Sequence, residues 1–155
     1  MKKIISLLTF LIFSCGIENP ESAVEFGAPL GLQSWLSNSS IYISFYGFNN
    51  ETYFEGYNVY ISDNPANLVS FDKLGRKVLK DENSSNKPSI EMTPFSDAPR
   101  QFFFEIRTTY YYTLINSQSV LNENLSPGTT YYITVRSYGN NVLSKKYANI
   151  VSITY

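Results

Sequence analysis

Hydrophobic and polar residues alternate with a period of two in several short stretches of the chain. In the second of these stretches, Ile41, Ile43 and Phe45 would share one face, because successive side chains of a strand point to opposite sides of a sheet. Tyr, Phe, Ile, Val and Thr dominate the alternating stretches, and helical spacing of apolar residues is scarce. We therefore predict five strands, at residues 30–35, 41–45, 56–61, 131–138 and 148–155.

Turn-forming residues separate the predicted strands. Residues 47–50 (Gly-Phe-Asn-Asn) follow the second strand, residues 63–65 (Asp-Asn-Pro) follow the third, and residues 139–141 (Gly-Asn-Asn) follow the fourth. Glycine and asparagine tolerate left-handed backbone conformations, and proline cannot donate a hydrogen bond to a sheet. Short strands separated by turns are typical of an antiparallel β-sandwich, so the pattern predicts an all-β fold.

Three segments resemble parts of a fibronectin type III domain. Residues 125–131 (Leu-Ser-Pro-Gly-Thr-Thr-Tyr) resemble the Leu-x-Pro-Gly-Thr-x-Tyr turn before strand F, residues 56–61 resemble strand C, and residues 40–45 resemble strand B. Together the resemblance covers residues 29–61 and 125–155. It implies a corner tyrosine whose ring is buried and whose hydroxyl group bonds nearby backbone. The corner residues are Leu125, Pro127, Gly128 and Tyr131.

The region between the two resembling parts is enlarged. Residues 62–124 are much longer than the corresponding region of a plain family member, so we expect an insertion in the sandwich formed by residues 29–155. The aromatic block at residues 101–115 would form a long strand or a hairpin added to the edge of a sheet, followed by strand E at residues 117–121. Alternation places six residues of this block on one apolar face, namely Phe102, Phe104, Ile106, Tyr110, Tyr112 and Leu114.

The amino terminus has the layout of an export signal. Lys2 and Lys3 precede an apolar run at residues 4–13 that is too short to span a bilayer. The following motif, Ile12-Phe13-Ser14-Cys15, resembles the lipobox of bacterial lipoproteins, although that pattern usually has a small residue in place of Phe13.

The lipobox resemblance implies a lipid anchor. Residues 1–14 would be removed as a signal peptide, and Cys15, the only cysteine of the chain, would be acylated. Two or more acyl chains anchor a protein stably to a membrane. Residues 15–28 are polar, acidic and interrupted by Pro20, so we expect them to tether the domain to the membrane.

The composition excludes several kinds of chemistry. The chain has no histidine, and its one cysteine is the predicted acylation site, so catalysis by histidine-containing triads and metal sites of imidazole or thiolate are excluded. No phosphate-binding loop or EF-hand pattern occurs. The formal net charge of −1 predicts no nucleic-acid partner. We predict no catalytic residue, metal or cofactor, and the open alternative is an enzyme with two converging carboxylates.

Two groups of residues are candidates for a binding surface. Outward-facing aromatic residues form the first, with Phe103 and Tyr111 foremost and Tyr60 and Tyr132 beside them. Tyrosine is enriched at recognition surfaces because its ring is rigid and amphipathic, but sheet propensity and an A/T-rich codon bias are a competing explanation. The second group is basic and would contact an acidic partner or lipid headgroups, unless it is only a solvated loop. Its members are Lys73, Arg76, Lys77 and Lys80.

These observations lead to a functional hypothesis and an alternative. We expect a lipid-anchored protein of the bacterial cell envelope, in the outer rather than the inner membrane because Gly16 stands where an aspartate would favour inner-membrane retention. Its sandwich would be a non-enzymatic binding or adhesion module for a protein or a glycan. The alternative is a structural or accessory subunit of a periplasmic or outer-membrane assembly, with residues 101–115 as its docking edge.

Overall fold

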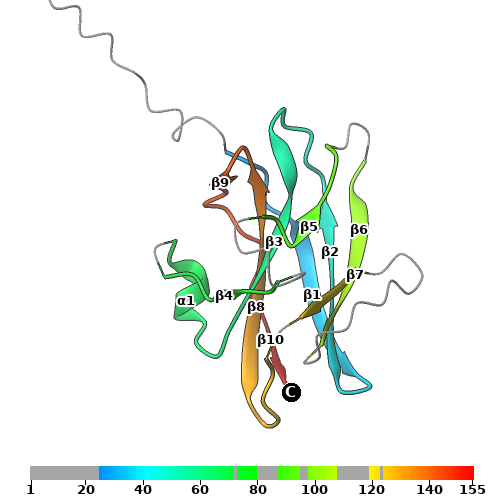
Figure 1. Cartoon of the computed structure of the whole chain (residues 1–155), viewed down its shortest axis with the longest axis vertical. Helices are drawn as coiled ribbons and strands as arrows, with labels where there is room; N and C mark the ends of the chain where they lie inside the picture. Colours follow the sequence, from blue (N-terminus) through cyan, green and yellow to red (C-terminus); the bar gives the residue numbers. More distant parts are fainter. Residues whose placement is uncertain (1–24, 72, 80–86, 95–97, 108–118, 123) are drawn as a thin grey trace, which may run out of the picture.

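The strands of the protein form two sheets that pack face to face (Figure 1). The computed structural model describes residues 25–155 except 72, 80–86, 95–97, 108–118 and 123. Sheet 1 has the strand order β1 (Leu30–Ser37), β2 (Ser40–Gly47), β6 (Arg100–Arg107) and β7 (Ser119–Asn122). Sheet 2 has the strand order β10 (Val151–Thr154), β8 (Thr130–Gly139), β3 (Phe54–Ser62) and β4 (Arg76–Lys77). Two short strands extend it: β5 (Ile90–Glu91) pairs with β3, and β9 (Val142–Leu143) pairs with β8. A short helix, α1 (Ala66–Val69), follows β3.

The predicted all-β sandwich is confirmed. The five predicted strands correspond to β1, β2, β3, β8 and β10, each with slightly different ends. The strand pairs of the described residues are antiparallel, apart from β6 and β7, which run parallel. The fold class therefore follows from the alternation of hydrophobic and polar positions.

The aromatic block at residues 101–115 was predicted to lie at an added sheet edge, and this position is wrong for its described part. Residues 100–107 form β6, which lies between β2 and β7 in the interior of sheet 1 rather than at an added edge. The expected strand E falls in β7, on the far side of β6 from β2. The physical reason is the register, because Phe104 and Ile106 lie opposite Ile43 and Ile41 and complete the inner apolar layer. Residues 108–115 of the block lie outside the described residues.

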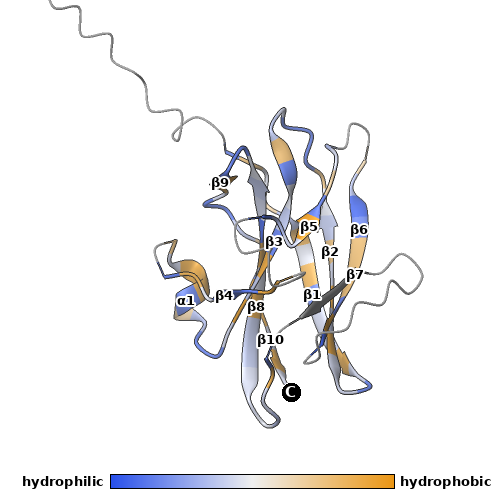
Figure 2. Cartoon of the chain, in the orientation of Figure 1, coloured by the Kyte–Doolittle hydropathy of each residue, from blue (hydrophilic) through white to orange (hydrophobic). Residues whose placement is uncertain are grey.

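The core between the sheets is rich in aromatic rings. Ile41, Ile43 and Phe45 of β2 point inward and are fully buried. The Phe45 ring lies 5.1 Å from the Tyr57 ring in an edge-to-face arrangement and 5.3 Å from the Phe102 ring. Each buried side chain of this kind stabilises the fold by about 1.5–3 kcal/mol. Figure 2 shows the hydrophobic segments concentrated on the strands and on α1, with hydrophilic residues in the connecting turns.

Two hairpin turns fix the register of neighbouring strands. Asn38 and Ser39 join β1 to β2 with φ angles of 48° and 58°, and Asn140 and Asn141 join β8 to β9 with φ angles of 48° and 59°. Two successive residues with positive φ form a type I′ turn, whose twist matches that of the strands it joins. Asparagine adopts this conformation at lower cost than most residues, which explains its presence at three of these four positions.

The end of the predicted tether belongs to the folded domain. Phe26 is fully buried, and its ring packs edge-on at 6.3 Å from the Phe54 ring. The Gly27 N–H donates to Glu51 Oε1 at 2.6 Å, and the Ser137 hydroxyl donates to the Gly27 carbonyl at 2.5 Å. A buried aromatic ring and these backbone bonds fix residues 26–28 against the sandwich, so this part of the segment cannot act as a free tether.

The four residues of the predicted corner precede and begin β8. The Tyr131 ring is buried, and its hydroxyl oxygen accepts a hydrogen bond of 2.8 Å from the Ser126 N–H. Gly128 has a φ angle of +79°, as the third position of a type II turn requires after Pro127. Leu125 is buried in the core. The bond from Tyr131 holds the turn against the strand that it leads into.

Candidate binding surfaces

The outer face of sheet 1 exposes large aromatic side chains from three neighbouring strands. Trp35 of β1 is 39% exposed, Tyr46 of β2 is 44% exposed and Phe103 of β6 is 41% exposed. Tyr42 of β2 lies opposite Trp35, and their rings stack at 5.7 Å between centroids with only 15° between their planes. We call these four residues the aromatic face.

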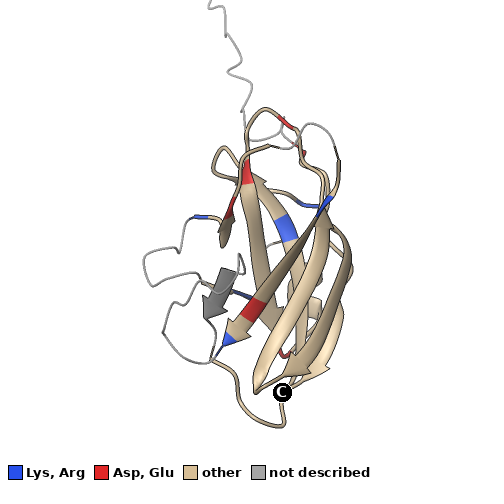
Figure 3. Cartoon of the chain, turned by 90° about the vertical axis from the view of Figure 1, so that its right-hand side faces the viewer, with Lys and Arg blue, Asp and Glu red and all other residues tan. Residues whose placement is uncertain are grey.

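The alternation of the strands explains why these side chains point outward. Tyr42 and Tyr46 alternate with the buried residues of β2, so they lie on the opposite side of the sheet. Phe103 lies opposite Ser44, which shares their side. β1 and β2 contain no charged residue, and Figure 3 shows that the charged residues of this face belong to β6. An aromatic surface on two strands without charged residues is typical of the centre of a recognition interface.

An ion pair between the buried Glu105 and the half-buried Arg107 borders the aromatic face. The Arg107 guanidinium donates from Nε to Glu105 Oε1 at 2.5 Å and from one Nη to Oε2 at 2.8 Å. Burial raises the pKa of Glu105, but hydrogen bonds from Arg107, Ser40 and Tyr42 outweigh it and hold this pKa below the ordinary value of a glutamate. The carboxylate therefore stays charged and orients Tyr42 beside Trp35.

The outer face of sheet 2, by contrast, is covered. Arg136 of β8 points away from the core, yet it is 0% exposed. Its guanidinium donates to the carbonyl oxygens of Leu68 at 2.8 Å, Ser144 at 3.2 Å and Lys145 at 2.5 Å. It also lies 4.6 Å from the centre of the Tyr147 ring. Arg136 thus fastens α1 and residues 144–147 over the sheet.

The prediction that Tyr60 is exposed was wrong. Tyr60 points to the outer face of sheet 2 but is only 7% exposed, and burial raises its pKa to about 12. β4 pairs with β3 beside it, with Lys77 directly opposite Tyr60. Tyr132, on the same face of β8, is half-buried. Tyr111 lies outside the described residues.

The predicted basic cluster does not come together. Arg76 and Lys77 are consecutive in β4, so their side chains point to opposite sides of sheet 2. Arg76 lines a cavity near the corner turn, whereas the Lys77 ammonium group donates to the Lys87 carbonyl oxygen. Burial lowers the pKa of Lys77. Lys73 is exposed in the preceding loop, and Lys80 lies outside the described residues.

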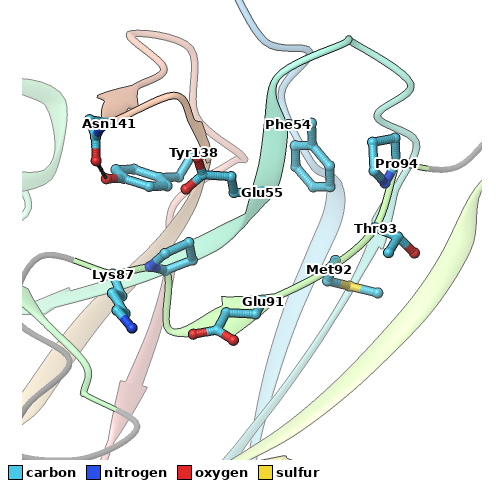
Figure 4. A pocket seen from close by; sticks show the side chains of 10 residues that line it. Phe54, Glu55, Lys87, Glu91, Met92, Thr93, Pro94, Tyr138 and Asn141 are labelled. Carbon is cyan, nitrogen blue, oxygen red and sulfur yellow. Dashed lines mark hydrogen bonds between the residues drawn. The ribbon is translucent and has the colours of Figure 1, made fainter.

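A pocket at the β9 end of sheet 2 contains two carboxylates (Figure 4). Its volume is about 650 Å³, and Glu55 and Glu91 line it together with Phe54, Met92 and Tyr138. Glu55 is turned toward Tyr138, whereas Glu91 is turned away from it, and Glu55 Oε1 accepts a hydrogen bond of 3.0 Å from the Asn140 N–H. The two carboxylates therefore point in different directions in Figure 4.

Within the described parts of the chain, no three His, Cys, Asp or Glu side chains lie close enough together to hold a metal ion. The same residues contain no helix that is both long and apolar enough to cross a bilayer.

Sequence reasoning missed most of the aromatic face. Phe103 was predicted as a surface residue, but Trp35, Tyr42 and Tyr46 were not. The signal was available for β2, because Tyr42 and Tyr46 alternate with its three inward residues and so belong to the outer face. For Trp35 no such signal exists, because a register shift between Leu30 and Gln33 interrupts the alternation of β1.

No family model matches the chain, and no curated protein matches it. Among solved structures it is similar to the spore cortex lytic enzyme SleM of Clostridium perfringens, with 16% sequence identity and a TM-score of 0.44. The similarity covers 86% of this chain and 30% of that enzyme's chain, and it carries no inference about function.

Proposed function

We propose that this protein is a lipid-anchored protein of the bacterial cell envelope whose fibronectin type III-like sandwich binds a protein or a glycan without catalysis. The binding surface in this proposal is the aromatic face. Anchoring in the outer membrane through acyl chains on Cys15 rests on the lipobox resemblance. The family assignment is supported by the corner geometry of Tyr131, whose hydroxyl bonds the backbone five residues upstream.

The observation that carries the binding role is the contrast between the two outer sheet faces. Sheet 2 is covered by the protein's own segments, and even its Arg136 is fully buried. Sheet 1 leaves Trp35 and Phe103 exposed on an outer face whose strands β1 and β2 lack charge. Exposing aromatic surface to water is unfavourable, and tryptophan and tyrosine are the residues that contribute most to binding when a partner desolvates them.

The accessory-subunit alternative has less support. It required residues 101–115 to form a free docking edge, but β6 is paired on both sides, with β2 and with β7. Along residues 104–106, β6 is paired on both sides, so this stretch has no free backbone edge for strand addition by another protein.

The test compares a double variant on the aromatic face with the wild type and a matched control. Wild-type protein, the double variant Trp35→Ala/Phe103→Ala and the control Tyr53→Ala would be used in pull-downs from envelope extracts and on glycan and host-matrix arrays. Tyr53 is 56% exposed but does not belong to the aromatic face. We expect the double variant to bind the partner at least about 10-fold more weakly, as loss of two central aromatic contacts implies, and the control to bind as the wild type does. If the wild type retained no partner while the purified protein turned over a substrate, the proposal would be wrong.

A further inference from the structure

A second concave site lies where β3 ends and β8 begins. This cavity has a volume of about 610 Å³ and lies between the turn that follows β3 and the turn that precedes β8. We call it the corner pocket. Its lining is dominated by polar side chains, namely Asp63, Asn67, Arg76, Asn124, Ser126 and Thr129.

The chemical groups of the corner pocket suit a ligand with neighbouring hydroxyl groups. Carboxylate, amide and guanidinium groups are planar: a carboxylate presents two acceptors side by side, a guanidinium two donors, and an amide one acceptor beside one donor, so each can engage two adjacent hydroxyls of a sugar ring. Asp63 and Arg76 have opposite charges, which favours a ligand without net charge. Leu74 and the edge of Tyr131 add an apolar wall for the C–H face of the ring.

The turn that supplies Asp63 and Asn67 is held in place before any ligand binds. The Ser62 hydroxyl donates to Asp63 Oδ1 at 3.5 Å and accepts from Asn67 Nδ2 at 3.3 Å. The Gly75 N–H donates to the Asn67 carbonyl oxygen at 3.1 Å. A side chain at Gly75 would lie 2.6 Å from the Ile61 carbonyl oxygen, so the loop packs directly on β3. Ordering costs on binding are therefore small.

Part of this polar lining is available to a ligand. Asp63 forms no ion pair with any residue that the structure describes, and Ser62 engages only one of its carboxylate oxygens. The Asn67 side chain donates to Ser62 through Nδ2. Its Oδ1 accepts no hydrogen bond from a residue that the structure describes. Asp63 is exposed, so its second carboxylate oxygen faces solvent and can accept a hydrogen bond from a ligand hydroxyl in place of water.

The corner pocket lies far from the point where the chain enters the domain. The described chain begins beside the β9 end of sheet 2, and β8 starts at the opposite end of the sandwich (Figure 1). Ten residues lie between Cys15 and Phe26, which limits the span from one to the other to about 40 Å. An anchor at Cys15 would therefore hold the β9 end toward the membrane and leave the corner pocket directed away from it.

We propose that the corner pocket binds one neutral saccharide unit. The corner pocket would be a second site of the proposed binding module, separate from the aromatic face. This proposal rests on the proposed function only for the orientation of the pocket away from the membrane. Asp63 and Asn67 accept hydrogen bonds from ring hydroxyls.

The test maps sugar binding on the isotope-labelled full chain by NMR. Glucose, galactose, mannose and N-acetylglucosamine would each be titrated, with glycine and inorganic phosphate as charged probes. We expect at least one sugar to shift the amide resonances of Asp63, Asn67 and Thr129. Asp63→Ala should weaken its binding by about 10-fold or more, because a hydrogen bond to a charged group is lost. Glu91→Ala, in the pocket at the β9 end, should bind the sugar as the wild type does.

Each other outcome contradicts the proposal. Shifts with glycine or phosphate but with no sugar would assign a charged ligand, and no shift with any sugar would leave the pocket without this function. Asp63→Asn, which preserves the size of the side chain, covers the case in which Asp63→Ala unfolds. Equal sugar affinity in Asp63→Asn and wild type would exclude the carboxylate. The double variant Trp35→Ala/Phe103→Ala should retain sugar binding, so failure of the aromatic face and failure of the corner pocket are separable.

Discussion

The buried guanidinium of Arg136 offers a direct test of how the outer face of sheet 2 is covered. Arg136→Met preserves the apolar stem of the side chain but removes every donor. Three hydrogen bonds to the carbonyl oxygens of Leu68, Ser144 and Lys145 would be lost, together with the contact to the Tyr147 ring. These acceptors belong to two separate segments, so the substitution releases both from the sheet.

The magnitude follows from two opposing contributions. Hydrogen bonds from a charged group contribute about 1.5–3 kcal/mol each, so three of them contribute on the order of 6 kcal/mol. Removing a buried cation recovers a desolvation penalty of several kcal/mol, which offsets part of that loss. We therefore expect the free energy of unfolding to fall by about 3 kcal/mol, which corresponds to a decrease in Tm of roughly 12 °C for a domain of this size.

Thermal unfolding followed by circular dichroism measures this change. Lys145→Met is the matched control, because Lys145 is exposed and only its backbone contacts Arg136. The control should unfold within about 2 °C of the wild type. Arg136→Lys should be intermediate, since an ammonium group cannot reach three carbonyls as the planar guanidinium does. If Arg136→Met unfolded at the temperature of the control, the covering segments would be held by something other than Arg136.

Three further predictions concern the corner, the ion pair and the anchor. Tyr131→Phe should lower the free energy of unfolding by about 1–2 kcal/mol in a denaturant titration because the Ser126 N–H loses its acceptor, whereas Tyr132→Phe should change it little. The pKa of Glu105 is lower in the folded state than in the unfolded state, so the Glu105 carboxylate stabilises the fold. This stabilisation is complete above the unfolded-state pKa of about 4.3 and is lost as the pH falls through the lower folded-state pKa. Wild-type protein should therefore lose stability on acidification below about pH 4.3 more steeply than Glu105→Gln, and equal slopes would contradict the assignment. Cys15→Ser should abolish labelling by radioactive palmitate and leave the folded domain intact, while persistent labelling would overturn the lipobox interpretation.

Local alternation predicted the inner layer of the sandwich well. Ile41, Ile43 and Phe45 are all buried on one face of β2, because a strand with one apolar face has only one way to bury it. The same rule placed Phe104 and Ile106 inward and Phe103 outward in β6. The split of Arg76 and Lys77 also follows from alternation, although the sequence analysis grouped them by charge alone.

Long-range pairing could not be predicted in the same way. The position of β6 beside β2 depends on the path of the chain between residues 62 and 100, which no local pattern specifies. Tyr60 and Tyr46 both alternate with buried residues, yet Tyr60 is buried and Tyr46 is exposed. The difference arises because β4, α1 and residues 144–147 cover sheet 2. Burial of an outward side chain is thus a property of the tertiary fold and not of the strand.

Photo-crosslinking in cells that export the protein tests the central claim most directly. A photoreactive phenylalanine analogue would replace Trp35 on the aromatic face or, separately, Tyr53 outside it. We predict a discrete crosslinked adduct with a partner protein or glycan from position 35 and none from position 53. An adduct from position 53 alone, or equal adducts from both positions, would show that the aromatic face is not the binding surface.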